Sequence, residues 1–310
     1  MTEPTPETIR GETIRGETVR GERRSVTDAP GATVARARPD RGGPLPGSGT
    51  AGHRRRPGMV SGVTAVLWRE WTVFRRVWFT TAFGSILEPV ILFVAFGFGF
   101  GALVAEVAGL AYLDFIATGA VAIGALFSSI FPALINGYFR RKEQRLYDGL
   151  LAAPLSIPEL VTGEAAWNAL RATAVGVATV GVAIAFGVRP AASVVLVPVI
   201  TVVAAFGFAC AGAAFGALIR STHSFDMIIV GVIVPMYVVA GTFFPIDGLP
   251  GPMEALALSN PVYHLVELLR VVTFGTGMTP MVFVHIAVVV GFDVVAWLLA
   301  VRLMRRALID

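Results

Sequence analysis

Long apolar runs separated by short polar segments dominate the sequence after residue 80. A helix needs about 20 mainly apolar residues to cross the hydrocarbon core of a bilayer. Six runs reach that length: Thr80–Val104, Tyr112–Tyr138, Ala166–Val188, Val194–Ile219, Phe225–Pro245 and Met281–Arg302. Hydrophobic residues make up 55% of the chain and charged residues 15%, which excludes an ordinary soluble domain. We therefore predict an all-α integral membrane protein with six transmembrane helices.

The polar start of the chain differs from these runs. Residues 1–58 contain the pentapeptide ETIRG twice and ETVRG once. This stretch has no apolar face to bury and lacks the apolar core of a signal peptide, so we predict a disordered arm in the cytoplasm. Residues 59–310 then form the six-span domain.

Val63–Trp78 has a helical pattern of its own. Apolar residues recur there at steps of three and four, and arginines lie off that line. Tryptophan and arginine on an amphipathic helix are typical of a helix in the membrane interface. The residues that define this predicted interfacial helix are Trp68, Arg69, Trp71, Arg75 and Arg76. The alternative is a frayed entry to the first span.

Phe139–Glu164 is a charged island between the second and third runs. A charge at the bilayer centre costs roughly 2.5–3.5 kcal/mol, so the island lies outside the hydrocarbon core. Its four cations place it on the cytoplasmic side by the positive-inside rule. Leucines at helical spacing predict a short helix that Pro154 ends, and Ser156 with Glu159 forms a capping box for the next helix. The island is either a contact surface or a plain connection. Because the other cations collect on the same side, we predict that both termini are cytoplasmic.

The segment between the fifth and sixth runs, Ile246–Met278, is apolar but interrupted by prolines, so no piece of it is long enough to span. Asn260 followed by Pro261 predicts a helix start. Three polar residues recur at every third position of that helix: His264, Glu267 and Arg270. We predict two short re-entrant helices in the outer leaflet; a helix lying on the surface is the alternative.

Three ionisable residues fall inside the runs, namely Glu88, Arg171 and Asp293. Such residues in a membrane span mark functional or structural polar contacts. Glu88 and Arg171 lie at similar depth, which predicts either a structural pair or contact with a substrate. The spacing Gly212-x-x-x-Gly216 suits close helix contact, within one chain or between two.

The sequence also excludes several kinds of chemistry. Lys142 is the only lysine and follows Arg141, so there is no P-loop of the form G-x-x-x-x-G-K-[ST]. Cys210 is the only cysteine and the four histidines are scattered, so we expect no catalytic motif, metal site or cofactor in this chain. The net charge of +4 reflects the arm and the ends of the spans, and we expect no nucleic-acid partner.

Four stretches resemble the permease subunits of type-2 ATP-binding-cassette exporters, in the branch that exports drugs or lipo-oligosaccharides. They are LWREWTVFRR, LEPVILFVAFGFGFG, RRKEQRLYDGLLAAPLSIPELVTGE and VAGTFFPIDGLPGPMEALALSNPVYHLVELLR, within about residues 60–306. The resemblance implies that the chain moves an amphiphilic drug, lipo-oligosaccharide or glycolipid out across the cytoplasmic membrane. It also implies a separate ATPase subunit in two copies, which binds ATP and Mg, and a second permease copy or a paralogue.

The resemblance further implies that Phe139–Pro154 is a coupling helix that docks on the ATPase. The residues assigned to this contact are Arg140, Arg141, Lys142, Glu143, Arg145, Leu146, Asp148, Leu150, Pro154 and Glu164.

The glycines of the GFGFG run leave little side-chain bulk near the outer end of the first span, at the level of the outer segment. We predict a cargo path there, formed by Glu88, Gly97, Gly99, Gly101, His264, Glu267 and Arg270. The alternative is that the glycines serve helix packing alone. Two other functional classes stay open on the residues: an ion-driven secondary transporter with Glu88 and Asp293 as relays, and a membrane scaffold without transport.

Overall fold

The computed structural model describes residues 58–101, 103–104, 106–144, 147, 149, 155–219, 221–247 and 249–309. The predicted arm, apart from Gly58, lies outside these residues. The elements, in chain order, are α1 (Met59–Phe93), η1 (Val94–Phe100), β1 (Glu106–Val107), β2 (Leu110–Ala111), α2 (Tyr112–Lys142), α4 (Ile157–Ala185), η2 (Ala192–Leu196), α5 (Val197–Leu218), α6 (Ser224–Ile228), η3 (Ile229–Ile233), α7 (Val234–Val238), α8 (Gly251–Leu258), α9 (Pro261–Phe274) and α10 (Pro280–Ile309).

The helical class of the fold is confirmed. Apart from the antiparallel pair β1–β2, every regular element in the described ranges is a helix. Four helices are long and apolar enough to cross a membrane: α2, α4, η2 with α5, and α10. The first predicted span lies in α1 and η1, and the fifth is the shorter apolar helix Ser224–Val238, so the count of six spans stays a prediction.

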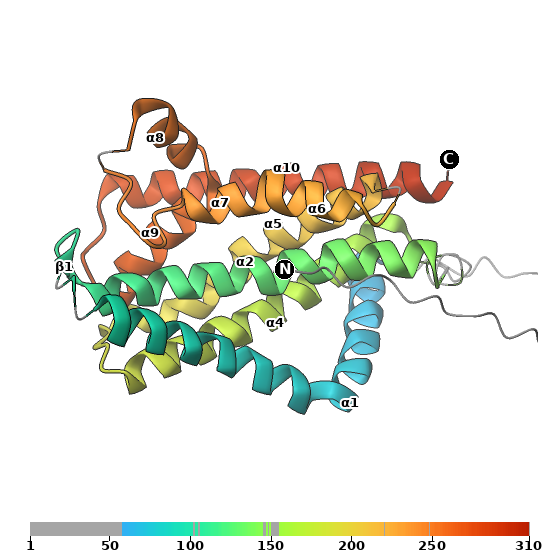
Figure 1. Cartoon of the computed structure of the whole chain (residues 1–310). Coiled ribbons are helices and arrows are strands. Elements are labelled where there is room, and N and C mark those ends of the chain that lie inside the picture. The colour runs from blue at the N-terminus through green and yellow to red at the C-terminus, as the bar shows by residue number, and fades with distance from the viewer. Residues whose placement is uncertain are drawn as a thin grey trace, which may run out of the picture. The chain divides into compact units, whose positions relative to one another are not determined.

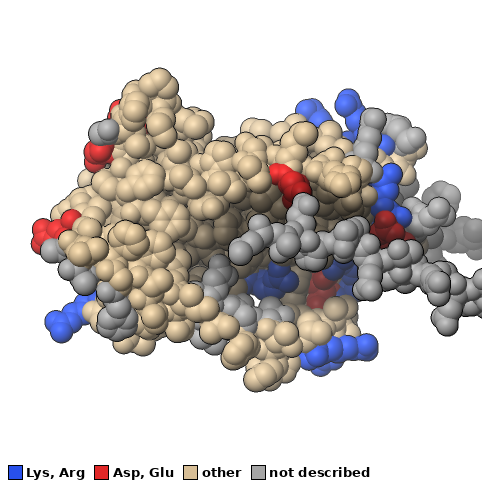
Figure 2. Space-filling view, in the orientation of Figure 1, with Lys and Arg blue, Asp and Glu red and all other residues tan. Residues whose placement is uncertain are grey.

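The helix α5 lies at the centre of the bundle. It packs against α2, α4 and α10, and α1 packs against α4 (Figure 1). Figure 1 also shows that α1 changes direction along its length, with its first part running across the bundle and its second part running alongside it. Figure 2 shows that the viewed face carries few charged residues between its two ends, as expected for a surface that contacts lipid.

The close contact between α5 and α2 depends on two glycines. A Cβ atom at Gly212 would lie 2.4 Å from the carbonyl oxygen of Ile130, and one at Gly216 would lie 2.9 Å from that of Leu134. A larger residue at either position therefore forces the helices apart. The predicted Gly212-x-x-x-Gly216 contact thus lies within one chain.

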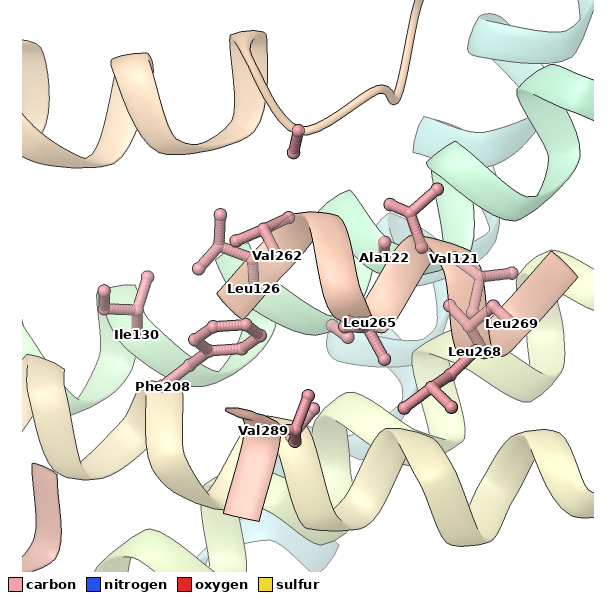
Figure 3. Close-up of a cluster of buried hydrophobic side chains, with 14 of the residues drawn as sticks. Val121, Ala122, Leu126, Ile130, Phe208, Val262, Leu265, Leu268, Leu269 and Val289 are labelled. Carbon is pink, nitrogen blue, oxygen red and sulfur yellow. The ribbon is translucent and has the colours of Figure 1, made fainter. Parts of the chain in front are cut away.

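The helix α9 supplies much of the core. Figure 3 shows Val262, Leu265, Leu268 and Leu269 of this helix between side chains of three other helices. Those side chains come from α2, α5 and α10: Val121, Ala122, Leu126, Ile130, Phe208 and Val289. Since α9 is only 14 residues long but buried against three long helices, packing rather than intrinsic helix stability holds it in place.

Two local predictions are confirmed. Ser156 caps α4 with a complete capping box, in which the Ser156 backbone N–H donates to Glu159 Oε2 at 2.6 Å. Asn260 caps α9, and its Oδ1 accepts from the backbone N–H of Val262 at 3.0 Å. The helix α9 then ends at Gly275, whose φ of 67° lies in the left-handed region that glycine adopts freely.

The first four residues of the GFGFG run lie in the π-helical segment η1, which continues α1, and Gly101 follows as its C-cap. Phe96 of this segment stacks on Phe243 with ring centroids 5.7 Å apart. A Cβ atom at Gly99 would meet no atom within 4 Å, whereas one at Gly97 would lie 3.1 Å from Leu113 Cδ1. Short π-helical segments occur frequently at functional sites.

Candidate functional site

A cluster of charged side chains joins four segments at one end of the bundle. We call it the charged cluster; it comprises Arg69 and Glu70 of α1, Arg140 of α2, Tyr147 of the segment between α2 and α4, and Glu164 of α4. Arg140 Nη1 donates to Glu70 Oε1 at 2.8 Å and to Glu164 Oε1 at 2.9 Å, and Arg140 Nη2 donates to Glu70 Oε2 at 3.0 Å. Arg69 Nη2 donates to Glu164 at 3.1 Å and also pairs with Glu70.

The cluster is largely shielded from water. Glu70 is 5% exposed and Tyr147 is fully buried. Burial opposes the charge on Glu70, but the Arg140 guanidinium outweighs this effect and holds the pKa of that carboxyl below its ordinary value. Burial, together with the neighbouring Glu164 carboxylate, raises the pKa of Tyr147, whose hydroxyl donates to Glu164 Oε2 at 2.7 Å. Glu70 therefore stays ionised, and Tyr147 stays neutral.

A small cavity of about 40 Å³ lies beside the charged cluster. Asn136, Asn168 and Arg171 contribute to its lining. A polar space of this size has room for ordered water, which typically satisfies the remaining polar atoms of buried clusters. Arg171 donates to the carbonyl oxygen of Ser128 at 3.2 Å; the side chain of Glu88, its predicted partner, lies outside the described part of the chain.

Arg141 has a different role from its neighbour Arg140. Its guanidinium donates to the carbonyl oxygens of Ala217, Gly216 and Ile219 at 2.8, 3.0 and 3.0 Å. The last carbonyls of a helix have no partner within the helix, and a cation there also interacts favourably with the helix dipole. Arg141 thereby fastens the end of α2 to the end of α5.

The predicted coupling residues thus divide into three groups. Arg140, Arg141 and Glu164 make contacts within the chain, whereas Lys142 and Glu143 are exposed. The remaining ones lie outside the described residues: Arg145, Leu146, Asp148, Leu150 and Pro154. Sequence reasoning did not single out Glu70 or Tyr147. The available signal was that Glu70 is the only acidic residue within the predicted interfacial helix.

The predicted interfacial helix presents two kinds of surface. Trp71 and Phe74 contact Trp167 of α4, with ring centroids 6.3 and 5.6 Å apart. Trp68, Arg75 and Arg76 are exposed. One side of the helix thus holds it to α4, and the other side has the tryptophan and arginine side chains that suit a lipid headgroup layer.

A second candidate site lies along one side of α9. A cavity of about 360 Å³, the outer cavity, is lined by Asp247, Tyr263, Glu267 and Arg270, among others. Arg270 donates to Glu267 Oε1 at 2.5 Å and to the Gly241 carbonyl oxygen at 2.6 Å, and it lies 4.1 Å from the centre of the Phe115 ring. The site combines fixed charges with an aromatic surface.

The structure brings only part of the predicted cargo path together. Phe115 belongs to the same apolar cluster as Phe96 of η1, and Leu110 of that cluster lines the outer cavity, so one apolar cluster lies between the glycine run and this cavity. His264 does not line the outer cavity; it lies against α10. An α-helix has about 3.6 residues per turn, so residues spaced three apart do not stay on one face. His264 and Arg270, which are two such steps apart, therefore lie on different faces of α9.

The part of the chain that the structure describes contains no group of three or more His, Cys, Asp and Glu side chains that could hold a metal ion. Several charged residues instead pair with one another or with backbone carbonyls. The fold is that of a multi-pass helical membrane protein with fixed polar contacts.

Comparison with known proteins gives the family. Residues 61–274 match the family described as "ABC-2 type transporter", and the chain belongs to this family. It is a permease subunit of the ABC-2 type.

Several curated relatives are similar over most of their length. Nodulation protein J of Rhizobium meliloti (strain 1021) is 28% identical over 246 residues, which cover 79% of this chain and 93% of the relative. Nodulation protein J of Rhizobium leguminosarum bv. trifolii is 29% identical over 253 residues, covering 82% and 96%. The inner membrane transport permease YadH of Escherichia coli (strain K12) is 23% identical over 232 residues, covering 74% and 90%.

Proposed function

We propose that the chain is the permease half of an ATP-driven exporter that moves an amphiphilic substrate out across the cytoplasmic membrane. Membership of the ABC-2 type family supports this and implies an ABC ATPase as a separate partner. The observation that carries the mechanism is the charged cluster, because Tyr147 and Arg140 link the segment after α2 to α1 and α4. On this proposal, a force applied near Tyr147 reaches the helices that border the membrane.

The proposed orientation places both termini and the charged cluster on the cytoplasmic side. In Figure 2 most of the visible Lys and Arg lie near the end where α10 finishes, which supports this orientation under the positive-inside rule. The exposed Arg302, Arg305 and Arg306 of α10 belong to the same end.

The proposed ATPase contact is the segment that follows Arg141. Arg140 and Arg141 hold the end of α2 within the bundle, so the exposed Lys142 and Glu143 are the described groups available to a partner. A complete exporter on this proposal contains two ATPase subunits, and a second permease copy or paralogue completes the translocation path.

The cargo proposed is a drug, a lipo-oligosaccharide or a glycolipid. The likeness to a relative named inner membrane transport permease supports transport. The outer cavity supports an amphiphile, because charged side chains and the aromatic Tyr263 and Phe274 line it together. We propose that the polar part of the cargo passes this cavity while its apolar part stays near lipid.

The test uses an exchange of charge at the exposed pair, Lys142→Glu with Glu143→Lys, in protein coexpressed with its ATPase subunit. Reversed charges at an interface repel or lose their partners, so we expect copurified ATPase to fall about tenfold or more and export to stop. The matched control is Arg305→Glu, an exposed cation on α10. Wild-type copurification and export in the exchanged variant overturn the proposed docking site. Failure of the wild-type protein to bind any ATPase overturns the function itself.

A further inference from the structure

Two buried histidines connect α9 to α10. His264 Nδ1 lies 2.7 Å from His285 Nδ1, and His264 Nε2 lies 2.9 Å from the carbonyl oxygen of Leu258. The two residues are 4% and 6% exposed. Leu258 is the last residue of α8, so this histidine link joins three helices in the order α8, α9, α10.

The contacts fix the position of each proton. A carbonyl oxygen only accepts, so His264 Nε2 must carry the proton that it donates to Leu258. Neutral His264 then has a lone pair on Nδ1, which accepts from Nδ1–H of His285. The two rings therefore hold different tautomers, and exchange of the two roles breaks the contact with Leu258.

The same geometry limits how much charge the pair accepts. A proton added to Nε2 of His285 leaves the Nδ1–H···Nδ1 bond intact. A proton added to Nδ1 of His264 places two N–H groups opposite each other at 2.7 Å, which no hydrogen bond tolerates. One proton is thus compatible with the link, and a second one breaks it.

We propose that the histidine link is a proton-controlled latch that holds the α8–α9 unit on α10 and opens when both rings are charged. Opening shifts α9, whose other side carries Glu267 and Arg270 at the outer cavity. The consequence for export rests on the proposed function; the latch itself does not.

Two side chains of α9 lie close to the two rings. Tyr263 of α9 contacts both rings, with centroids 5.2 Å from His264 and 5.9 Å from His285. Glu267 of α9 is the acidic side chain that interacts electrostatically with His285. The helices α2, α5, α7 and α8 carry titratable groups, but none of those described forms a hydrogen bond, ion pair or ring contact with either imidazole. The chain thus surrounds the latch with apolar side chains and one carboxylate.

The first experiment measures the tautomers directly. Protein labelled with ¹⁵N-histidine is placed in lipid bilayers, and the single variants His264→Asn and His285→Asn assign the signals. At neutral pH we expect one Nε2–H ring and one Nδ1–H ring for the pair, with the exposed His223 as an internal reference. Identical tautomers, or titration of both rings in parallel with His223, overturn the proposal.

The second experiment follows α9 by hydrogen–deuterium exchange between about pH 8 and 5, where histidine charge changes, after correction for the intrinsic rate. We expect exchange in α9 to rise severalfold toward pH 5 while that of α2 stays flat. Asparagine at 285 keeps a donor near the Nδ1 position and cannot charge, so His285→Asn should remove the pH dependence. His285→Ala lacks the donor and should exchange fast at every pH. A flat wild-type profile, or identical profiles for the two variants, overturns the latch. If the profiles hold but export shows no pH dependence, the latch stands and the proposed link to export falls.

Discussion

Arg140 Nη1 and Glu70 Oε1 lie 2.8 Å apart although 70 positions separate the two residues in the chain. This pair joins the predicted interfacial helix to the start of the predicted coupling segment. Because Arg140 is paired within the chain, we expect its replacement to lower the stability of the permease itself.

Removal of one member of this pair is expected to destabilise the bundle. The variant Glu70→Gln leaves the half-buried Arg140 with one carboxylate instead of two, and breaking an ion pair with a buried member in this way costs about 3 kcal/mol. The measurement is thermal unfolding in detergent. Arg75→Gln, which changes an exposed charge on the same helix, is the control and should unfold as the wild type does. Equal stability of both variants contradicts a structural role for the charged cluster.

The pH dependence of stability has a predicted direction. The pKa of Glu70 lies below its ordinary value of 4.5 in the folded protein, because Arg140 outweighs the effect of burial. Its contribution is therefore complete above about pH 4.5 and is lost as the pH falls through the lowered pKa. The stability difference between wild type and Glu70→Gln should be constant from pH 7 to about pH 5 and shrink at lower pH. A difference that grows on acidification contradicts this assignment.

The contact between α5 and α2 gives a steric prediction. Gly212→Val places carbon atoms where the Ile130 carbonyl oxygen lies, so we expect loss of folded protein or destabilisation of about 3 kcal/mol or more. Gly181→Val on α4 is the matched control, because a Cβ atom there meets nothing within 4 Å. The yield of monodisperse protein and its unfolding temperature are the readouts. Similar behaviour of both variants contradicts close packing at Gly212.

The proposed cargo path predicts variants that assemble but do not export. Gly99→Leu fills open space in η1 without a backbone clash, and Glu267→Gln removes the partner of Arg270 in the outer cavity. We expect both variants to bind the ATPase and hydrolyse ATP, while export falls or cargo preference shifts. Loss of assembly in Gly99→Leu together with unchanged export in Glu267→Gln supports helix packing instead of a path.

Features coded by neighbouring residues were predictable from the sequence. The capping box of Ser156 and Glu159 and the cap at Asn260 depend on residues two or three positions apart, and both are present. Apolar periodicity likewise predicted the helical class. The pairs that join distant segments were not predictable, because nothing in the local pattern connects Glu70 with Arg140 or His264 with His285.

The candidate site shows the same limit. Charge placed Arg140 and Arg141 at the end of a span correctly, since cations collect there. The charge pattern could not show whether the two arginines contact a neighbouring helix or a second protein. In the structure their hydrogen-bond acceptors belong to α1, α4 and the end of α5. A polar stripe inferred from three-residue steps also could not show that His264 faces α10 while Arg270 faces a cavity.

The glycine contact between α5 and α2 has a consequence for motion. Where a glycine Cα meets a carbonyl oxygen directly, no side chain can change rotamer to absorb sliding, so the two helices move as one body. The helices around them are built differently: α1 continues into η1, and α6 continues into η3, so each contains a π-helical stretch that relaxes the regular hydrogen-bond ladder. The segments α1 with η1 and α6 with η3 are therefore the parts of the bundle best able to bend, whereas α2 and α5 keep a fixed spacing.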